Sequence, residues 1–425
     1  MDTAIVQHQL SSMAENLVGS EIIKLAGEIK EKIAQGEQIY NLTIGDFNPN
    51  IFPIPDGLKE EILCAYEANE TNYPAANGIQ ELRESVAHFI AQHQGLNYSA
   101  SDFLIAGGAR PLIYAAYQTL VNPGEKVLFP VPSWNNNHYT HLAHAEQVFI
   151  ETTAENNFMP TASDLAPHIK DAAVLALCSP LNPTGTAFTK EQLQEIGALV
   201  LAENQRRGEH RKPLYIIYDQ IYWVLSYDGV NHVDPVSLFP ALKPYTLFID
   251  GLSKAFAATG VRVGWSFGPA PIIQKMKAIL GHIGAWSPKA EQVATANYLT
   301  RSKDVNRFLN HFKQRIQERL IKFHQGFNEL ENEGYPVKAI APQAAIYLTV
   351  NINLLGKTTP EGEVISSTPQ ITQYLLNEAK IAIVPFSAFG ASADSTWYRL
   401  SVGGVAIEDI TVIINQLKQA IDQLA

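Results

Sequence analysis

One lysine in this sequence follows an apolar run, in a setting that suggests covalent chemistry. Lys254 follows residues 247–249 and lies within residues 251–264, a segment rich in small side chains. Removal from water lowers the pKa of a lysine, and the neutral amine can form a Schiff base with an aldehyde. Arg262 follows eight residues later and can bind a phosphate through two parallel hydrogen bonds. Taken alone, a lysine is more often a solvated surface charge, so the hypothesis depends on what else lies nearby.

A carboxylate and a phenol follow a second apolar run, residues 214–218. Asp219 ends this run, and Tyr222 follows three residues later. A carboxylate inside a dry cleft is costly without a cationic partner, and the protonated nitrogen of an electron-accepting ring is such a partner. The same spacing would let Tyr222 reach that ring. The alternative role for Asp219 is the N-cap of a helix.

A glycine pair precedes a helix that we expect over residues 111–120. Gly107 and Gly108 would let the backbone N–H groups at the helix N-terminus approach a phosphate, and the helix dipole adds to the attraction. Ala109 and Arg110 would contribute mainly through their backbone. A Gly-Gly pair before a helix is, by itself, also typical of a simple turn.

Two further candidates follow apolar runs. Trp134 comes after residues 127–129 and offers an aromatic face on which a planar ring can stack, although a tryptophan is ordinarily a core residue. Asn182 opens the tetrapeptide Asn-Pro-Thr-Gly after residues 174–178, which alone predicts only a turn.

The elements that must position these residues alternate along the chain. We expect strands at residues 103–106, 127–129, 174–178, 214–218, 246–249 and 261–267, with helical patterns at 79–94, 111–120, 190–205 and 271–280. Short apolar strands that alternate with helices predict an α/β fold with a largely parallel sheet covered on both faces. Ligands bind at the carboxyl ends of strands in such sheets, and the candidates above lie at strand ends.

The pattern changes after about residue 305. A long polar helix, expected over residues 305–331, precedes a remainder rich in strands and helices. We therefore predict a large domain over residues 56–304. We expect residues 305–425, together with the N-terminal residues 1–55, to form a smaller α+β domain.

With these motifs in view, residues 251–264 resemble the cofactor-attachment motif of class I aminotransferases, the aspartate-aminotransferase-like family of fold type I. The other motifs follow in the family's order, and the resemblance extends from about residue 20 to the end of the chain. It implies pyridoxal 5'-phosphate (PLP) as the cofactor, carried by Lys254 as a Schiff base. It also implies a mostly parallel seven-stranded sheet in the large α/β domain.

The resemblance implies a role for each motif in holding the cofactor. Lys254 carries the cofactor and moves the proton, Asp219 keeps the ring nitrogen protonated, and Tyr222 and Asn182 bind the ring oxygen. Trp134 stacks on the ring. The residues expected to hold the phosphate are Gly108, Ala109, Arg110, Ser253, Arg262 and, from a second subunit, Tyr73. The last role requires a homodimer with its active site at the interface.

The implied reaction moves an amino group between an L-amino acid and a 2-oxo acid. Gly45, Asn182 and Arg399 resemble the residues that bind the substrate, and the planar fork of an arginine suits a carboxylate. Residues 281–286 contain no arginine or lysine, where aspartate-specific members carry an arginine. We therefore expect that aspartate is not the main substrate through that route. Trp286 and Tyr347 are candidates for the side-chain pocket and equally for the core.

One position departs from the family pattern in the phosphate site. Gly251 stands where some relatives carry a phosphate-binding hydroxyl, so that contact is expected to be lost or supplied by Ser253.

Other reactions on the same fold stay open. A carbon–sulfur β-lyase, a racemase or a decarboxylase would keep Lys254, Asp219 and Asn182. A PLP-binding regulatory domain is a more distant alternative, because the chain has no spare basic helix-turn-helix segment. No G-x-G-x-x-G motif follows a strand, which disfavours a nicotinamide dehydrogenase.

Composition excludes several other classes. The chain carries 31 basic and 42 acidic residues for a net charge of −11, which disfavours a nucleic-acid partner. Its two cysteines fit a reducing compartment, and no Cys/His cluster has metal-ligand spacing. The N-terminus lacks the features of a signal peptide and no apolar run is long enough to span a membrane. We therefore expect a soluble, cytoplasmic protein without a metal.

Overall fold

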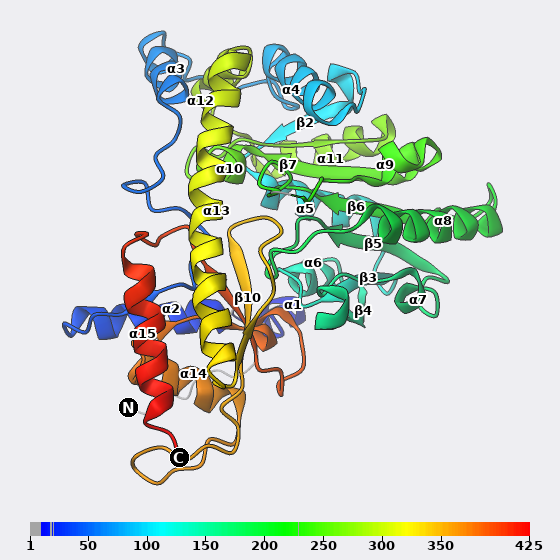
Figure 1. Ribbon diagram of the computed structural model, residues 1–425. Helices are drawn as coiled ribbons and strands as arrows, with labels where there is room; N and C mark the ends of the chain where they lie inside the picture. The colour runs from blue at the N-terminus through cyan, green and yellow to red at the C-terminus, as the bar shows by residue number, and fades with distance from the viewer. Residues whose placement is uncertain (1–9, 18, 20, 228) are drawn as a thin grey trace, which may run out of the picture.

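The computed structural model describes residues 10–17, 19, 21–227 and 229–425. A seven-stranded sheet forms the centre of its larger part (Figure 1). In spatial order its strands are β2 (Phe103–Ala106), β8 (Gly264–Phe267), β7 (Thr246–Gly251), β6 (Tyr215–Asp219), β5 (Ala172–Cys178), β3 (Lys126–Val131) and β4 (Glu146–Glu151). All neighbours are parallel except β8, which runs antiparallel to β2 and β7. The predicted mostly parallel seven-stranded sheet is therefore confirmed.

Helices cover both faces of this sheet. One face packs against α5 (Ala109–Leu120), α6 (Asn136–Leu142) and α11 (Ala270–Ile283). The other face packs against α4 (Gln80–Gln94), α8 (Lys190–Arg207), α12 (Lys289–Leu299) and α13 (Ser302–Asn332). Because neither face meets water, the central strands are continuous apolar runs, which is why the sequence reveals them.

The structure adds one strand that was not predicted to the large sheet and shortens another. β4 was not expected, because this edge strand is only partly buried and carries glutamate at both ends. The strand expected over residues 261–267 begins three residues later, at Gly264. Arg262 has φ +62°, a left-handed conformation that no strand residue adopts, so the chain is still turning at that point.

A second sheet lies below the first in Figure 1. It is antiparallel, in the order β12 (Val384–Pro385), β13 (Trp397–Ser401), β10 (Tyr347–Ile352) and β9 (Val337–Ala339). The helices α14 (Thr368–Asn377) and α15 (Asp409–Asp422) lie beside it, and α13 runs along both parts of the molecule (Figure 1).

The N-terminal segment joins this lower part. β1 (Tyr40–Asn41) pairs in parallel with β11 (Ile381–Ala382), and Ile29 of α2 (Glu21–Ala34) packs against Leu376 of α14. This arrangement is compatible with the proposed division at residues 55 and 305, which stays a prediction. The remaining helices are α1 (Ser12–Glu15), α3 (Asp56–Glu67), α7 (Ala162–Leu165), α9 (Pro235–Leu238) and α10 (Leu252–Ala255). None of the helices in the described ranges is long and apolar enough to cross a bilayer.

Candidate active site

A cavity of about 750 Å³ lies where the carboxyl ends of β5, β6 and β7 meet the second sheet. It gathers residues that the sequence places far apart. The predicted site residues that line it are Gly45, Ala109, Arg110, Trp134, Asn182, Asp219, Tyr222, Ser253, Lys254, Arg262 and Arg399. The structure therefore brings all of these residues to one cavity, and their roles there stay predictions.

Lys254 lies in the short helix α10, directly after β7. Its Nζ donates a hydrogen bond to the carbonyl of Gly45 at 2.5 Å. Burial lowers the pKa of Lys254 to about 8, an effect that the carboxylate of Asp46 opposes and the guanidinium of Arg399 reinforces. At pH 7 roughly a tenth of the amine is thus uncharged and able to act as a nucleophile or base, far more than for an ordinary lysine.

Asp219 ends β6 with its carboxylate facing the cavity. One oxygen, Oδ1, accepts the backbone N–H of Ile221 at 3.0 Å. Among the described residues no cationic side chain pairs with Asp219. Burial raises the pKa of this carboxyl to about 6. A cationic ligand in the cavity would lower that pKa and stabilise the ionised form.

Arg399 is almost fully buried, with 2% of its surface exposed. Its Nη1 donates to Oδ1 of Asn182 at 3.0 Å and its Nη2 donates to the carbonyl of Thr43 at 2.5 Å. The Nε–H has no hydrogen-bond partner. A buried guanidinium with an unsatisfied donor at a cavity wall is suited to a carboxylate ligand.

The turn between β2 and α5 is built so that the backbone can approach an anion. Gly108 has φ +99°, and a Cβ there would lie 2.3 Å from Nη2 of Arg262. Arg262 itself donates from Nη1 to the carbonyl of Thr259 and from Nη2 to the carbonyl of Gly107, each at 2.7 Å. The first N–H groups of α5 therefore lie next to a fixed guanidinium, an arrangement typical of phosphate sites.

Gly251 stands where some relatives carry a hydroxyl, and the structure gives a steric reason for the glycine. A Cβ on Gly251 would lie 2.9 Å from both Cα of Gly264 and the carbonyl oxygen of Val263. A hydroxyl-bearing side chain at 251 thus does not fit without movement of β8. Ser253, by contrast, lines the cavity.

Trp134 lines the cavity together with Arg110, whose guanidinium lies over the indole ring at 4.7 Å from the ring centroid. The side chain of Arg110, and not only its backbone, therefore faces the cavity. This contact restrains the ring that was expected to stack on a cofactor.

Tyr73 does not line the cavity of its own chain. The side chain is 82% exposed and contacts Trp286 edge to face, with ring centroids 5.2 Å apart. Trp286 is likewise absent from the cavity wall, whereas Tyr347 is part of it. Of the two pocket candidates, only Tyr347 thus reaches the site within one chain.

Several lining residues were not expected from the sequence, among them Thr43, Asp46 and Thr259. The Thr259 hydroxyl donates to Oδ1 of Asp46 at 2.7 Å, which fixes a carboxylate next to Gly45 and Lys254. The order Gly45–Asp46 was visible, but its proximity to Thr259 depends on how the N-terminal segment packs on the large sheet. That packing has no local sequence signal.

Comparisons with known proteins agree with this geometry. A family profile described as "Aminotransferase class I and II" matches residues 37–417. An aspartate aminotransferase of Rhizobium meliloti is 28% identical over 420 residues, which cover 98% of this chain and 95% of the relative. A probable aspartate/prephenate aminotransferase of Rhizobium leguminosarum is 29% identical over 374 residues, covering 87% of this chain and 89% of that protein.

Solved structures give the same result. A crystal structure of the aspartate aminotransferase from Rhizobium meliloti superposes with a TM-score of 0.90 at 27% identity, covering 98% of this chain and all of that one. The Thermus thermophilus aspartate aminotransferase with maleate superposes with a TM-score of 0.85 at 25% identity, covering 97% of this chain and all of that one.

Proposed function

The chain belongs to the class I and II aminotransferases, a family of PLP-dependent enzymes, and from this premise we propose the residues and the substrate class of its reaction. It moves an amino group between an L-amino acid and a 2-oxo acid. The observation that carries the assignment of the site is one cavity shared by Lys254, Asp219, Arg262 and Arg399. Each supplies a group that the cofactor or an amino acid requires.

The residues present fit PLP. Asp219 is a partly buried carboxylate without a cationic partner among the described residues, as expected of a group that pairs with a pyridinium once the cofactor binds. Arg262 and the turn at Gly108 form a phosphate cradle that a Cβ would fill. Asn182 and Tyr222 offer polar groups for the ring oxygen, and Trp134 offers a ring for stacking.

When bound, the cofactor supplies an electron sink that makes the Cα–H of an amino acid acidic. Lys254 then acts as the base and acid that moves this proton, for which its pKa of about 8 is well matched. Arg399 lines the cavity, binds the α-carboxylate through its guanidinium N–H groups and fixes the direction of the Cα–H bond. While the Lys254 amine is not bonded to the cofactor, its hydrogen bond to the carbonyl of Gly45 holds it in place.

The side chain that the substrate carries is the next part of the proposal. We propose that aspartate is not the main donor through the route that its specific relatives use, because residues 281–286 contain no arginine or lysine. Trp286 from that segment contacts Tyr73 and not the cavity of its own chain. Several relatives carry the name aspartate aminotransferase, so a panel of amino acids must include acidic, neutral and aromatic donors.

A half-reaction assay tests the proposal. PLP-loaded protein should lose its visible absorbance when an amino acid is added and regain it when 2-oxoglutarate or pyruvate follows. Release of ammonia and pyruvate without this recovery would instead indicate a β-lyase. A Lys254→Ala variant that turns over amino acids at the wild-type rate would refute the assignment, with Lys243→Ala, on the surface near Asn97, as the control.

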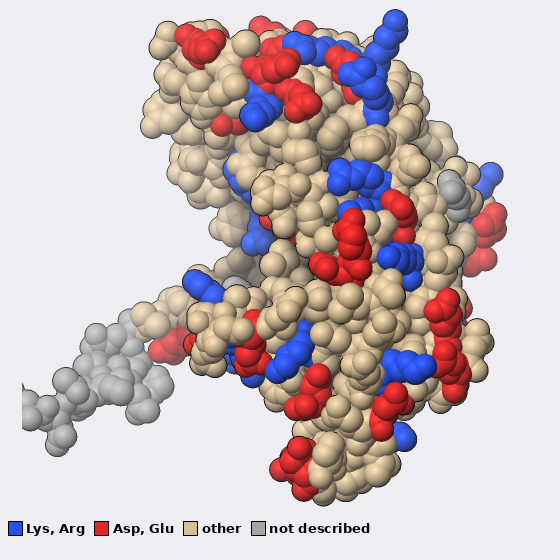
Figure 2. Space-filling view, turned by 60° about the vertical axis from the view of Figure 1, so that its left-hand side comes forward, with Lys and Arg blue, Asp and Glu red and all other residues tan. Residues whose placement is uncertain are grey.

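The exposed Tyr73 supports a second proposal, a homodimer in which this side chain completes the partner's site. A fully active monomer in solution would contradict it. We expect no nucleic-acid partner, and on the face in Figure 2 basic and acidic side chains are intermingled, without one continuous basic patch.

A further inference from the structure

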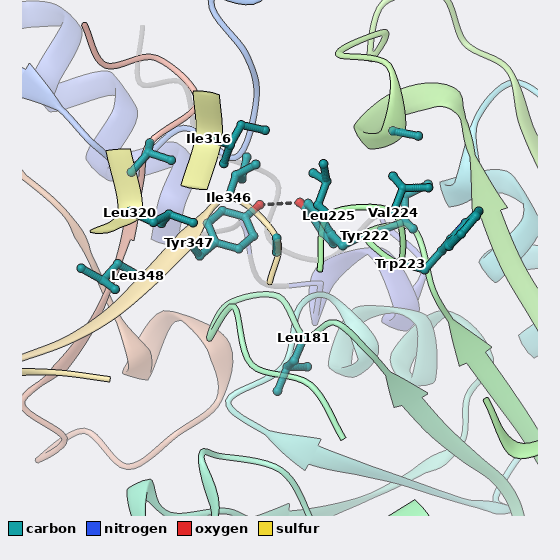
Figure 3. Close-up of a cluster of buried hydrophobic side chains, with 14 of the residues drawn as sticks. Leu181, Tyr222, Trp223, Val224, Leu225, Ile316, Leu320, Ile346, Tyr347 and Leu348 are labelled. Carbon is teal, nitrogen blue, oxygen red and sulfur yellow. Dashed lines mark hydrogen bonds between the residues drawn. The ribbon is translucent and has the colours of Figure 1, made fainter. Parts of the chain in front are cut away.

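A hydrogen-bonded pair of buried tyrosines connects the two sheets at the cavity (Figure 3). Tyr222 lies in the turn after β6, and Tyr347 is the first residue of β10. Their hydroxyl oxygens are 2.6 Å apart, and their rings meet edge to face with centroids 5.6 Å apart. Tyr222 is 2% exposed and Tyr347 is 1% exposed. This short contact is therefore shielded from bulk water.

The number of protons limits how the pair can be arranged. Each phenol has one proton to donate and can also accept. Among the described side chains, each of these two hydroxyls has only the other as its hydrogen-bond partner. If Tyr222 uses its proton to bind the cofactor's ring oxygen, its own oxygen must accept the proton of Tyr347.

We propose that Tyr347 is a positioning residue that donates its hydroxyl proton to Tyr222 and so directs the proton of Tyr222 toward the ring oxygen of the cofactor. This inference rests on the proposed function. A phenol that accepts a hydrogen bond becomes a stronger donor, because successive hydrogen bonds polarise one another in a dry site. Tyr347 would thus strengthen the hold of Tyr222 on the ring oxygen without touching the cofactor.

The backbone around Tyr347 is held tightly enough for this role. The N–H of Ala344 donates to the carbonyl of Gly185 at 2.9 Å, in the loop that begins at Asn182. The N–H of Ala345 donates to the carbonyl of Leu225 at 2.8 Å, in the turn that carries Tyr222. Tyr347 is therefore fixed relative to both loops that reach the ring oxygen, as a preorganised site requires.

The ring of Tyr347 has a different neighbour from its hydroxyl. Arg399 pairs with Thr349 across β10 and β13, which places its side chain diagonal to Tyr347 on the same face. The guanidinium lies 4.7 Å from the centroid of the Tyr347 ring. Loss of the hydroxyl should thus affect the cofactor, whereas loss of the ring should affect the substrate carboxylate.

This separation defines the experiment. Three variants are compared with wild-type holoenzyme: Tyr347→Phe, Tyr222→Phe and the control Tyr374→Phe. Tyr374 is a buried tyrosine of α14 whose hydroxyl donates to the carbonyl of Ala420 at 2.7 Å, so its loss removes a similar bond far from the cavity. The readouts are the pH midpoint of the cofactor's visible absorbance, the dissociation constant of PLP from the stripped protein, and kcat and KM.

Tyr347→Phe should raise the pH midpoint of the cofactor's visible absorbance by about 0.3–1 pH unit. A weaker hydrogen bond from Tyr222 to the ring oxygen disfavours the deprotonated form of the bound cofactor. Tyr222→Phe should shift it further in the same direction, and Tyr374→Phe should leave it unchanged. PLP should bind several-fold more weakly to Tyr347→Phe. The KM for the amino acid should stay within about twofold, since the ring over Arg399 is retained.

The two hypotheses fail in different ways. An unchanged midpoint in Tyr347→Phe, with a raised KM, would overturn the inference and show that Tyr347 serves the substrate. A wild-type protein that gains no visible band with PLP would overturn the proposed function itself. If Tyr347→Phe does not fold, replacement of Tyr347 by 3-fluorotyrosine, a stronger donor, should lower the midpoint, and no shift there would equally overturn the inference.

Discussion

Replacement of Asp219 by asparagine is expected to stabilise the cofactor-free protein while it weakens cofactor binding. Asp219 lies in the cavity without a cationic partner among the described residues, and burial raises its pKa from 3.8 to about 6. Because the folded pKa is higher than the unfolded one, stability is lost as the pH rises between these two values and stays lost above them. Asparagine carries no charge and can still accept the N–H of Ile221.

The size of the effect follows from the shift. A difference of about two pKa units at about 1.4 kcal/mol each gives roughly 3 kcal/mol at neutral pH, and close to zero near pH 4. PLP should reverse the order of stability, because its ring nitrogen supplies the missing cation. The variant should then bind PLP at least about a hundredfold more weakly, a loss of about 3 kcal/mol.

Urea unfolding of the stripped proteins at pH 7.5 and pH 4 measures the first effect, and a fluorescence titration with PLP measures the second. Asp394→Asn, at an exposed position, is the matched control and should change neither. Equal stability of wild type and Asp219→Asn at pH 7.5 would refute the claim that the unpaired Asp219 destabilises the cofactor-free protein. A stability advantage of the variant that is as large at pH 4 as at pH 7.5 would also refute it.

Three other changes test the rest of the site. Gly108→Ala should weaken PLP binding at least about tenfold in the same titration, because the left-handed φ and the contact at 2.3 Å with Arg262 cost about 1–3 kcal/mol. Arg399→Lys should raise KM for the amino acid about 10–100-fold in steady-state kinetics, because one ammonium cannot bind both Asn182 and a bidentate carboxylate. The visible absorbance band of the cofactor should not change in this variant. The rate at which stripped protein captures PLP should rise with pH, with its midpoint near pH 8, where half of the Lys254 amine is neutral, as stopped-flow absorbance would show. A midpoint near the ordinary lysine value of 10.5 would contradict this pKa.

The strands that could be predicted are those buried on both faces. The run at residues 103–106 matches β2 in full, because four consecutive buried positions leave no polar residue to interrupt it. β4 lies at the edge of the sheet and has one fully buried position, Ile150, so its sequence lacks such a run. β1, β11 and β12 have two residues each, too few for any periodic signal. Their pairing depends on packing between distant segments.

The same distinction applies to the site. Lys254, Asp219 and Asn182 each follow a buried strand, so a local pattern predicts both the residue and its edge of the sheet. The bond between Tyr222 and Tyr347 joins residues 125 positions apart in different sheets. It depends on where β10 lies relative to the large sheet, which no run of residues specifies. Sequence reasoning could thus name Tyr347 only as a candidate for pocket or core.

The charge of the cavity explains how an acidic protein can bind anionic ligands. The chain has a net charge of −11. Yet the cavity wall carries four cations, Arg110, Lys254, Arg262 and Arg399, against the carboxylates Asp46 and Asp219. The negative charges of a phosphate and a substrate carboxylate would balance this excess of positive charge. The local field of these side chains, and not the net charge of the chain, therefore determines which ligands are stabilised there.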